Sequence, residues 1–245
     1  MCTVTFIPAG DKIYITSNRD EKHWRSSAFP PAVYPYTSGK LLFPKDGDAG
    51  GTWIAAHENG NAMVFLNGGF VRHRSKPPYR KSRGLILLDL LDSINPLIGF
   101  KMKSLLQIEP FTAVIWNAGQ LFECRWDGEK KYTTELPAAE PHIWSSVTLY
   151  DEAVVKKRKS WFTEWLKQPR QAEHPEPEDI LHFHQFTGDG DAHNDLLMNR
   201  NGQVFTVSVT QLTLTDEETH MHYLDLKNSK AFTQHLIVEK SMAGR

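Results

Sequence analysis

Short runs of apolar and β-branched residues open the chain and predict paired β-strands. Thr3–Ile7 and Ile13–Thr16 are such runs, and a Pro-Ala-Gly-Asp turn separates them. Thr52–His57 and Ala62–Leu66 form a second pair, joined through the Asn-Gly dipeptide that favours a hairpin turn. Segment 29–36 lies between the pairs and is rich in proline and aromatic residues, so we expect a loop there.

The hydrophobic period changes in the middle of the chain. Apolar residues in segment 82–108 recur at helical spacing, and Asn95-Pro96 is typical of an N-cap followed by proline at the first helical position. We therefore expect two helices in series. Phe111–Trp116 and Leu121–Trp126 return to the strand pattern and predict another hairpin.

The last part of the chain mixes both patterns. Asp151–Lys167 is predicted as a helix, because acidic residues stand at its start and apolar residues share one face. A shorter helix is expected at Glu178–Phe186, and strands at Gln203–Leu212 and His220–Leu226. Strands before and after a central helical block predict an α+β fold in which helices cover antiparallel sheets.

The polar, proline-rich segment 168–177 is a candidate domain boundary. However, the strands predicted after it are too few to bury a core of their own. We therefore expect a single domain over residues 1–245.

Charge and composition exclude several classes of protein. The chain has 28 Lys and Arg against 29 Asp and Glu, a net charge of −1, which argues against nucleic acid or an anionic membrane as a bulk partner. No apolar stretch approaches the ~18–20 residues of a membrane span, and no signal peptide is visible. Only two cysteines occur, which excludes a disulfide framework and suits a reducing compartment. We expect a cytoplasmic protein.

Cys2 is the first candidate for chemistry. Removal of Met1 would leave Cys2 with a thiol and a free α-amine, whose unperturbed pKa is ~7.7–8.0. Such an amine can act as the base that activates the thiol. The other interpretation is an ordinary residue at the end of the chain. Cys124 lies on a predicted strand, and we expect it to be buried and unreactive.

The predicted first hairpin places Cys2 opposite Asn18, next to a run of polar residues. Arg19 would lower the pKa of the thiol and bind a substrate carbonyl or carboxylate, and Asp20 would hold the α-amine. Alternatively, this run caps a strand and forms surface ion pairs.

Several short motifs occur in a specific order. They are the initial Met-Cys-Thr-Val, the tetrapeptide Asn18–Glu21, and the segments Gly50–Ile54, Leu66–Gly69 and Trp144–Leu149. Together they resemble the NRDE family, which is named after the tetrapeptide and includes the transport and Golgi organisation protein 2 proteins. That family is similar to N-terminal nucleophile hydrolases, so the resemblance implies a four-layer αββα sandwich.

A more distant resemblance is to cysteine-type amidases, which include bile salt hydrolases and penicillin V acylases. By motif match it implies that Cys2 is nucleophile and base, that Arg19 and Asp20 position it, and that Asn67 supplies the oxyanion hole. The order of residues around the arginine differs from the amidase pattern. Ser146 stands where NRDE relatives often have asparagine, and the second amidase asparagine has no clear counterpart.

Asn67 and Trp53 each allow two interpretations. The amide of Asn67 either donates to a developing oxyanion or serves a turn before two glycines. Trp53 follows a glycine-rich loop and is either an apolar wall of a substrate site or part of a plain turn. We expect Asn18, Trp53 and Ser146 to contribute to substrate binding.

The histidines do not predict a metal site. His220 and His222 share one face of a predicted strand, whereas His182 and His184 diverge on a helix. No third ligand stands at a recognisable spacing. The basic run Lys156–Lys159 is expected to form a solvated helix face.

Two functions follow. The first is hydrolysis of an amide C–N bond in a small-molecule substrate, with no cofactor. The alternative is a non-catalytic carrier of haem or a lipid-like ligand, because eukaryotic members of the resembled family are implicated in haem trafficking and lipid homeostasis. Neither function requires nucleic acid or a membrane span.

Overall fold

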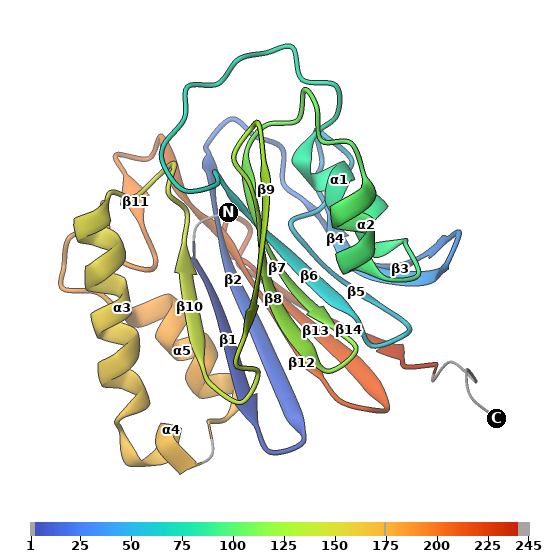
Figure 1. Ribbon diagram of the computed structural model, residues 1–245. Helices are drawn as coiled ribbons and strands as arrows, with labels where there is room; N and C mark the ends of the chain where they lie inside the picture. The colour runs from blue at the N-terminus through green and yellow to red at the C-terminus, as the bar shows by residue number, and fades with distance from the viewer. Residues whose placement is uncertain (1–2, 174, 240–245) are drawn as a thin grey trace.

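Two antiparallel seven-stranded sheets form the centre of the molecule (Figure 1). The computed structural model describes residues 3–173 and 175–239. The first sheet has the order β10-β1-β2-β12-β13-β14, and β11 also pairs with β12. Its strands are β1 (Thr3–Ala9), β2 (Lys12–Lys22), β10 (His142–Ser145), β11 (Asn199–Arg200), β12 (Val204–Leu214), β13 (Glu218–Asp225) and β14 (Lys230–Ile237).

The second sheet runs in sequence order from β3 to β9. Its strands are β3 (Phe29–Tyr36), β4 (Gly39–Lys45), β5 (Ile54–His57), β6 (Ala62–Asn67), β7 (Phe111–Asn117), β8 (Gln120–Trp126) and β9 (Lys131–Leu136). The predicted hairpins are confirmed: β1 pairs with β2, β5 with β6 and β7 with β8.

Helices cover the outer face of each sheet. Asn95 caps α2 as predicted, since its side-chain oxygen accepts from the backbone N–H groups of Leu97 and Ile98, each at 3.0 Å. None of the helices in the described chain has the length and apolar character needed to cross a membrane. The helices are α1 (Arg83–Leu91), α2 (Pro96–Met102), α3 (Glu152–Leu166), α4 (Pro169–Glu173) and α5 (Pro177–Phe186).

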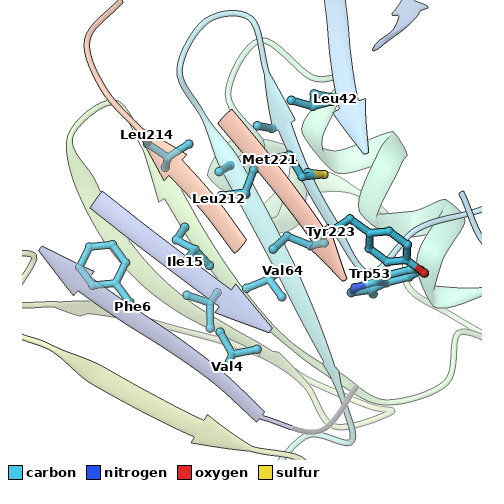
Figure 2. Packing of buried hydrophobic residues seen from close by; sticks show 14 of the residues in the cluster. Val4, Phe6, Ile15, Leu42, Trp53, Val64, Leu212, Leu214, Met221 and Tyr223 are labelled. Atoms are coloured by element: carbon cyan, nitrogen blue, oxygen red, sulfur yellow. The ribbon is translucent and has the colours of Figure 1, made fainter. Parts of the chain in front are cut away.

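Three apolar clusters hold four layers together. The largest lies between the sheets and joins Phe6 and Ile15 of one sheet to Val64 of the other (Figure 2). A second cluster packs α1 and α2 on the second sheet, and a third packs α3 and α5 on the first. The fold is therefore the predicted αββα sandwich, in which helices cover part of the outer face of each sheet.

Two expectations about the strands are wrong. Segment 29–36 is strand β3 rather than a loop; it lies at the edge of its sheet, where proline costs no ladder hydrogen bond on the open side. In the first hairpin, Thr3 rather than Cys2 pairs with Asn18, so the register is shifted by one residue. A shift of one matters because it exchanges the two faces of a strand.

The segment expected to be a connector includes the short helix α4. The strands that follow it do not form a separate sheet, because β12 pairs along the length of β2. The first and the last strands of the described chain thus share one sheet.

Candidate active site

A cavity of about 430 Å³ opens where β2 of one sheet meets β6 and the start of α1 on the other side. Three side chains singled out from the sequence line it, namely Arg19, Trp53 and Asn67. Ten of the other lining residues are Glu21, Arg25, Asp46, Gly51, Thr52, Phe65, Tyr79, Lys81, Arg83 and Glu109.

Strand alternation divides the tetrapeptide of β2 between two faces. Arg19 contacts Trp53 and Asp46 of the opposite sheet, so it points into the space between the sheets. Asn18 and Asp20 make their contacts with the helix side of the sheet instead. Successive side chains of a strand point to opposite faces, so adjacent residues of one motif have different surroundings.

Arg19 is fixed on three sides. Its exposed fraction is only 5%, and its guanidinium lies 4.6 Å from the centre of the Trp53 ring. Nη2 donates to Asp46 Oδ2 at 2.5 Å, and Glu21 Oε2 lies 3.8 Å from the same nitrogen. Stacking and ion pairing together hold the guanidinium at the wall of the cavity. The Trp53 indole N–H, by contrast, has no partner among the described residues.

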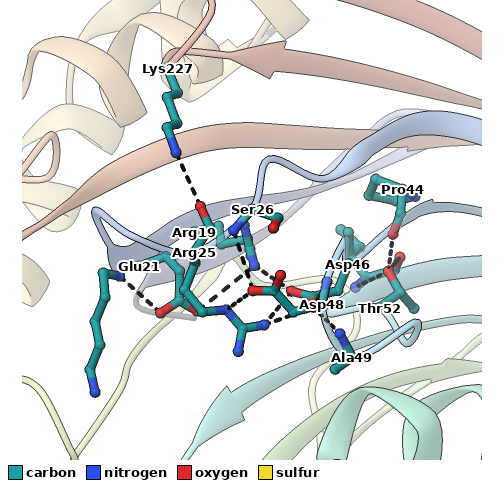
Figure 3. A network of polar contacts seen from close by, with 12 residues as sticks. Arg19, Glu21, Arg25, Ser26, Pro44, Asp46, Asp48, Ala49, Thr52 and Lys227 are labelled. Carbon is teal, nitrogen blue, oxygen red and sulfur yellow. Dashed lines mark hydrogen bonds and ion pairs between the residues drawn. The ribbon is translucent and has the colours of Figure 1, made fainter.

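Asp46 organises the wall beside Arg19 (Figure 3). Its Oδ1 accepts from the backbone of Ala49 at 2.7 Å, and Nη2 of Arg25 donates to both carboxylate oxygens at 2.7 and 2.8 Å. Burial alone would raise the pKa of Asp46. The Ala49 hydrogen bond and the two arginines outweigh burial and hold that pKa below its ordinary value.

Sequence reasoning missed Asp46 and Arg25. Both lie in loops that follow or precede strands, and nothing in the linear pattern pairs Asp46 with Arg19, 27 positions away. The only local signal was an aspartate in a turn just before the glycines of Gly50–Ile54.

Asn67 ends β6 at the rim of the cavity. Ser146 is fully buried and does not line the cavity; its hydroxyl donates to the Asn67 carbonyl oxygen at 3.0 Å. Gly68 has a φ of +86°, and a Cβ there would lie 2.6 Å from Val147 Cγ2. The glycine is thus required for the close approach that places Ser146 behind Asn67.

Asn18 connects β2 to the helix layer. Its amide nitrogen donates to the carbonyl oxygens of His184 and Leu196 at 3.0 and 2.8 Å, so its oxygen faces His184 Nδ1 at 2.5 Å. Nδ1 must then carry the proton, and Nε2 accepts from the Thr5 hydroxyl at 2.8 Å. Burial lowers the pKa of His184 to about 3, and the charge of Arg158 acts in the same direction. The histidine is therefore neutral.

Asp20 also points to the helix side. Tyr150 donates to its Oδ2 at 2.5 Å and Thr206 to its Oδ1 at 2.6 Å. The Tyr150 ring in turn packs 3.7 Å from the guanidinium carbon of Arg158. The structure thus places Asp20 and Arg19 next to each other in the chain but on opposite faces of β2.

Arg158 corrects a prediction. We expected the basic run of α3 to be solvated, yet Arg158 is fully buried. Its guanidinium donates to the Thr3 hydroxyl and to the carbonyl oxygens of Asn194 and Asp195, at 3.0 and 2.7 Å for the two carbonyls. Hydrogen bonds to neutral acceptors replace water around the charge.

Cys2 lies outside the described residues. Cys124 is buried in the second sheet, as expected, and burial raises the pKa of its thiol to about 11. Within residues 3–173 and 175–239, no three His, Cys, Asp or Glu side chains gather where they could hold a metal ion.

The family model described as Transport and Golgi organisation 2 matches residues 1–223. The chain belongs to that family. The NRDE resemblance inferred from the motifs is thereby confirmed. Among curated proteins, no sequence matches this chain.

Solved structures with a similar fold include an amidase and a hydrolase. An N-acylethanolamine-hydrolyzing acid amidase ortholog of Caenorhabditis elegans has a TM-score of 0.61 at 10% identity, covering 86% of this chain and 92% of that one. A mutant conjugated bile acid hydrolase of Clostridium perfringens has a TM-score of 0.56 at 10% identity, covering 96% of each chain. The TM-scores show that this member of the Transport and Golgi organisation 2 family shares a fold with these proteins, and identities of 10% show no more than that.

Proposed function

We propose that the protein is a cysteine-type N-terminal nucleophile hydrolase that cleaves an amide C–N bond in a small-molecule substrate. The observation that carries the proposal is the convergence of Arg19, Trp53 and Asn67 on one cavity between the sheets. The cavity adjoins the end of the β1–β2 ladder, whose last described pair is Thr3 with Asn18.

In the proposed reaction, removal of Met1 exposes the α-amine of Cys2. The amine takes the thiol proton, the thiolate attacks the substrate carbonyl, and the oxyanion accepts from the Asn67 amide. The α-ammonium returns the proton to the nitrogen of the substrate amide, and the substrate's amine product leaves. Water then cleaves the thioester. The proposed role of Asp20 is to hold the α-ammonium, since a carboxylate oxygen can accept more than one hydrogen bond.

We assign Arg19 to orienting the substrate rather than to lowering the pKa of the thiol. Asp46 already neutralises much of its charge, which limits how far it can lower the pKa of a neighbouring thiol. Its planar guanidinium lines the cavity and is proposed to orient a carbonyl or carboxylate of the substrate.

A haem carrier fits the described cavity less well. Among its described lining residues there is no His or Met to ligate iron, and most of the charged ones form ion pairs across the wall. A lipid-like ligand is the carrier alternative that the test below addresses.

Alkylation tests the nucleophile. After mass measurement has shown that Met1 is removed, iodoacetamide should modify Cys2 much faster than Cys124, because burial disfavours the Cys124 thiolate. Cys2→Ser should abolish this fast phase, and the matched variant Cys124→Ser should retain it. Equal labelling of both cysteines, or an intact Met1, would contradict an activated N-terminal thiol.

Turnover tests the reaction. Hydrolysis of acyl-amides, lactones and acylated amino acids should require Cys2, and Asn67→Ala should lower kcat by about 10²–10³-fold without slowing alkylation of Cys2. The protein is a carrier if the form without Met1 hydrolyses none of these compounds, yet it and the Cys2→Ser variant bind haem or a lipid with equal affinity.

A further inference from the structure

A strongly basic segment connects β6 to α1. In Figure 1 it arches over the ends of the strands of both sheets. Residues 59–88 contain no Asp or Glu, although the chain as a whole has a net charge of −1. The same stretch contains six cations, Arg72, Arg74, Lys76, Arg80, Lys81 and Arg83. The positive charge of the molecule is therefore concentrated locally.

The first four of these cations face solvent and form no ion pair within the described chain. Lys81 and Arg83, in contrast, pair with Asp89 and Glu109 at 2.6 and 3.0 Å. The exposed cations consequently have no internal partner for their charge and are available to an external anion.

Apolar side chains are exposed beside these cations. Val71 is 73% exposed and Phe70 48% exposed. The turn after α2 presents Leu106, which is 70% exposed, and Arg80 joins this turn to the basic segment by donating to the Ser104 carbonyl oxygen at 2.8 Å. Exposed apolar groups rimmed by cations are typical of a surface that contacts another phase or partner.

The apolar surface continues along α2. Ile98 and Met102 are spaced by four residues, lie on one side of the helix, and are 58% and 80% exposed. Ile94, which is 92% exposed, precedes them at the same spacing, and Leu106 follows. The exposed Lys101 lies within this stripe. We call Phe70, Val71, Ile94, Ile98, Met102, Leu106 and the four free cations the basic-apolar surface.

We propose that the basic-apolar surface docks onto a bilayer that contains anionic lipids. Cations attract the anionic headgroups, and exposed Val, Leu, Ile and Met side chains gain free energy by entering the boundary between headgroups and acyl chains. A second copy of the chain would bring like charges together. Nucleic acid would attract the cations but would leave the apolar side chains in water.

Docking in this way would bring the cavity close to the lipid. Tyr79, Lys81 and Arg83, at the end of the same basic segment, line the cavity. The proposal does not depend on catalysis, since it rests on exposed side chains that are not part of the proposed site.

Vesicle co-sedimentation tests the charge. The whole protein should bind vesicles with about 30 mol% phosphatidylserine in phosphatidylcholine, bind phosphatidylcholine alone far less, and dissociate as salt is raised. Arg72→Gln/Arg74→Gln/Lys76→Gln should lower the partition coefficient about fivefold per cation, or about 100-fold together. The control Lys156→Gln/Lys159→Gln/Lys167→Gln removes equal charge from α3 and its C-cap, and should change the partition coefficient less than about threefold.

Two exposed apolar positions test insertion. Val71→Ser/Leu106→Ser keeps every charge and should weaken vesicle binding at least tenfold. Absence of binding to the anionic vesicles, or equal losses in the loop and α3 variants, would overturn the proposal. The opposing outcome is that the protein binds single-stranded RNA as tightly as anionic vesicles. If Val71→Ser/Leu106→Ser left that RNA affinity unchanged, the surface would be assigned to nucleic acid.

Discussion

At the scale of single residues, the tetrapeptide of β2 serves two layers of the molecule. Arg19 faces the cavity, whereas Asn18 holds α5 and the loop before β12 through three hydrogen bonds. A run of four polar residues in sequence does not reveal this division. It follows only once the strand register is known, and the register expected from the turn was wrong by one residue.

Arg158 shows a second limit of sequence reasoning. Its neighbours are lysines, and a basic run is usually solvated. Helical spacing gave a contrary signal, because Arg158 stands four residues before Phe162, which is buried. The carbonyl groups that receive its hydrogen bonds come from residues 194 and 195, which the sequence does not place near α3.

We predict that Arg158→Met lowers the free energy of unfolding by about 3 kcal/mol or more, because it removes the donor to two partly buried carbonyls and to the buried Thr3 hydroxyl. Urea denaturation measures the change. Lys156→Met, in the same basic run but exposed, should change stability by less than about 0.5 kcal/mol. Equal effects of the two substitutions would show that burial of Arg158 has no energetic importance.

At the scale of elements, strongly patterned segments were predicted well. The hairpin of β7 and β8 and helix α3 are close to their predicted bounds, whereas β2 of the first hairpin continues to Lys22, six residues beyond the predicted end at Thr16. β3 was missed because proline is rare in strands, although an edge strand tolerates it. Its neighbour β4 (Gly39–Lys45) was not predicted at all.

The approach of β6 to the segment before α3 depends on Gly68. Gly68 and Gly119 have similar φ angles of +86° and +82°, but a Cβ at Gly68 would meet Val147 and Thr148, whereas a Cβ at Gly119 would meet no atom within 4 Å. Gly119→Ala should therefore cost only the backbone strain of about 1–2 kcal/mol. Gly68→Ala should cost about 1–3 kcal/mol more, because Val147 and Thr148 must move.

Thermal or urea unfolding of both glycine variants measures this difference. Gly68→Ala should also impair any activity that depends on Asn67, since the neighbouring backbone shifts. If both variants lose the same stability, the close contact of Gly68 with Val147 is not a constraint on the fold.

At the scale of the whole molecule, the layered architecture was predicted but the contacts across layers were not. Arg19, Trp53 and Asn67 were singled out from sequence and converge on one cavity. Asp46 reaches that site only because the second sheet packs on the first. Side chains that meet through packing of two sheets have no fixed spacing in the chain, which is why sequence patterns miss them.

Buried neutral histidines should make the whole molecule sensitive to mild acid. Unfolded His184 binds a proton near its ordinary pKa of 6.5, whereas in the folded protein burial lowers that pKa to about 3. The unfolded state therefore binds more protons below pH 6.5, and stability falls as pH falls. Burial also lowers the pKa values of His57 and His222, which act in the same direction.

We expect His184 alone to account for about 2 kcal/mol of lost stability between pH 7 and pH 5. Urea denaturation at the two pH values measures this loss. His184→Gln should reduce the loss of unfolding free energy between pH 7 and pH 5 by that amount. His235→Gln, at an exposed position, should leave the loss as in the parent protein. If the unfolding free energy of His184→Gln fell with pH as steeply as that of the parent, His184 would be accepting a proton in the folded protein.

The pairing of β2 with β12 has a consequence for synthesis on the ribosome. Some 180 residues separate the end of β2 from the start of β12, and the strand that presents Arg19 cannot acquire this neighbour until Leu214 has left the exit tunnel. Until then an eleven-residue strand has one open edge, which is a template for aggregation. Nascent chains halted before Val204 are therefore candidates for chaperone binding and degradation rather than partly active products.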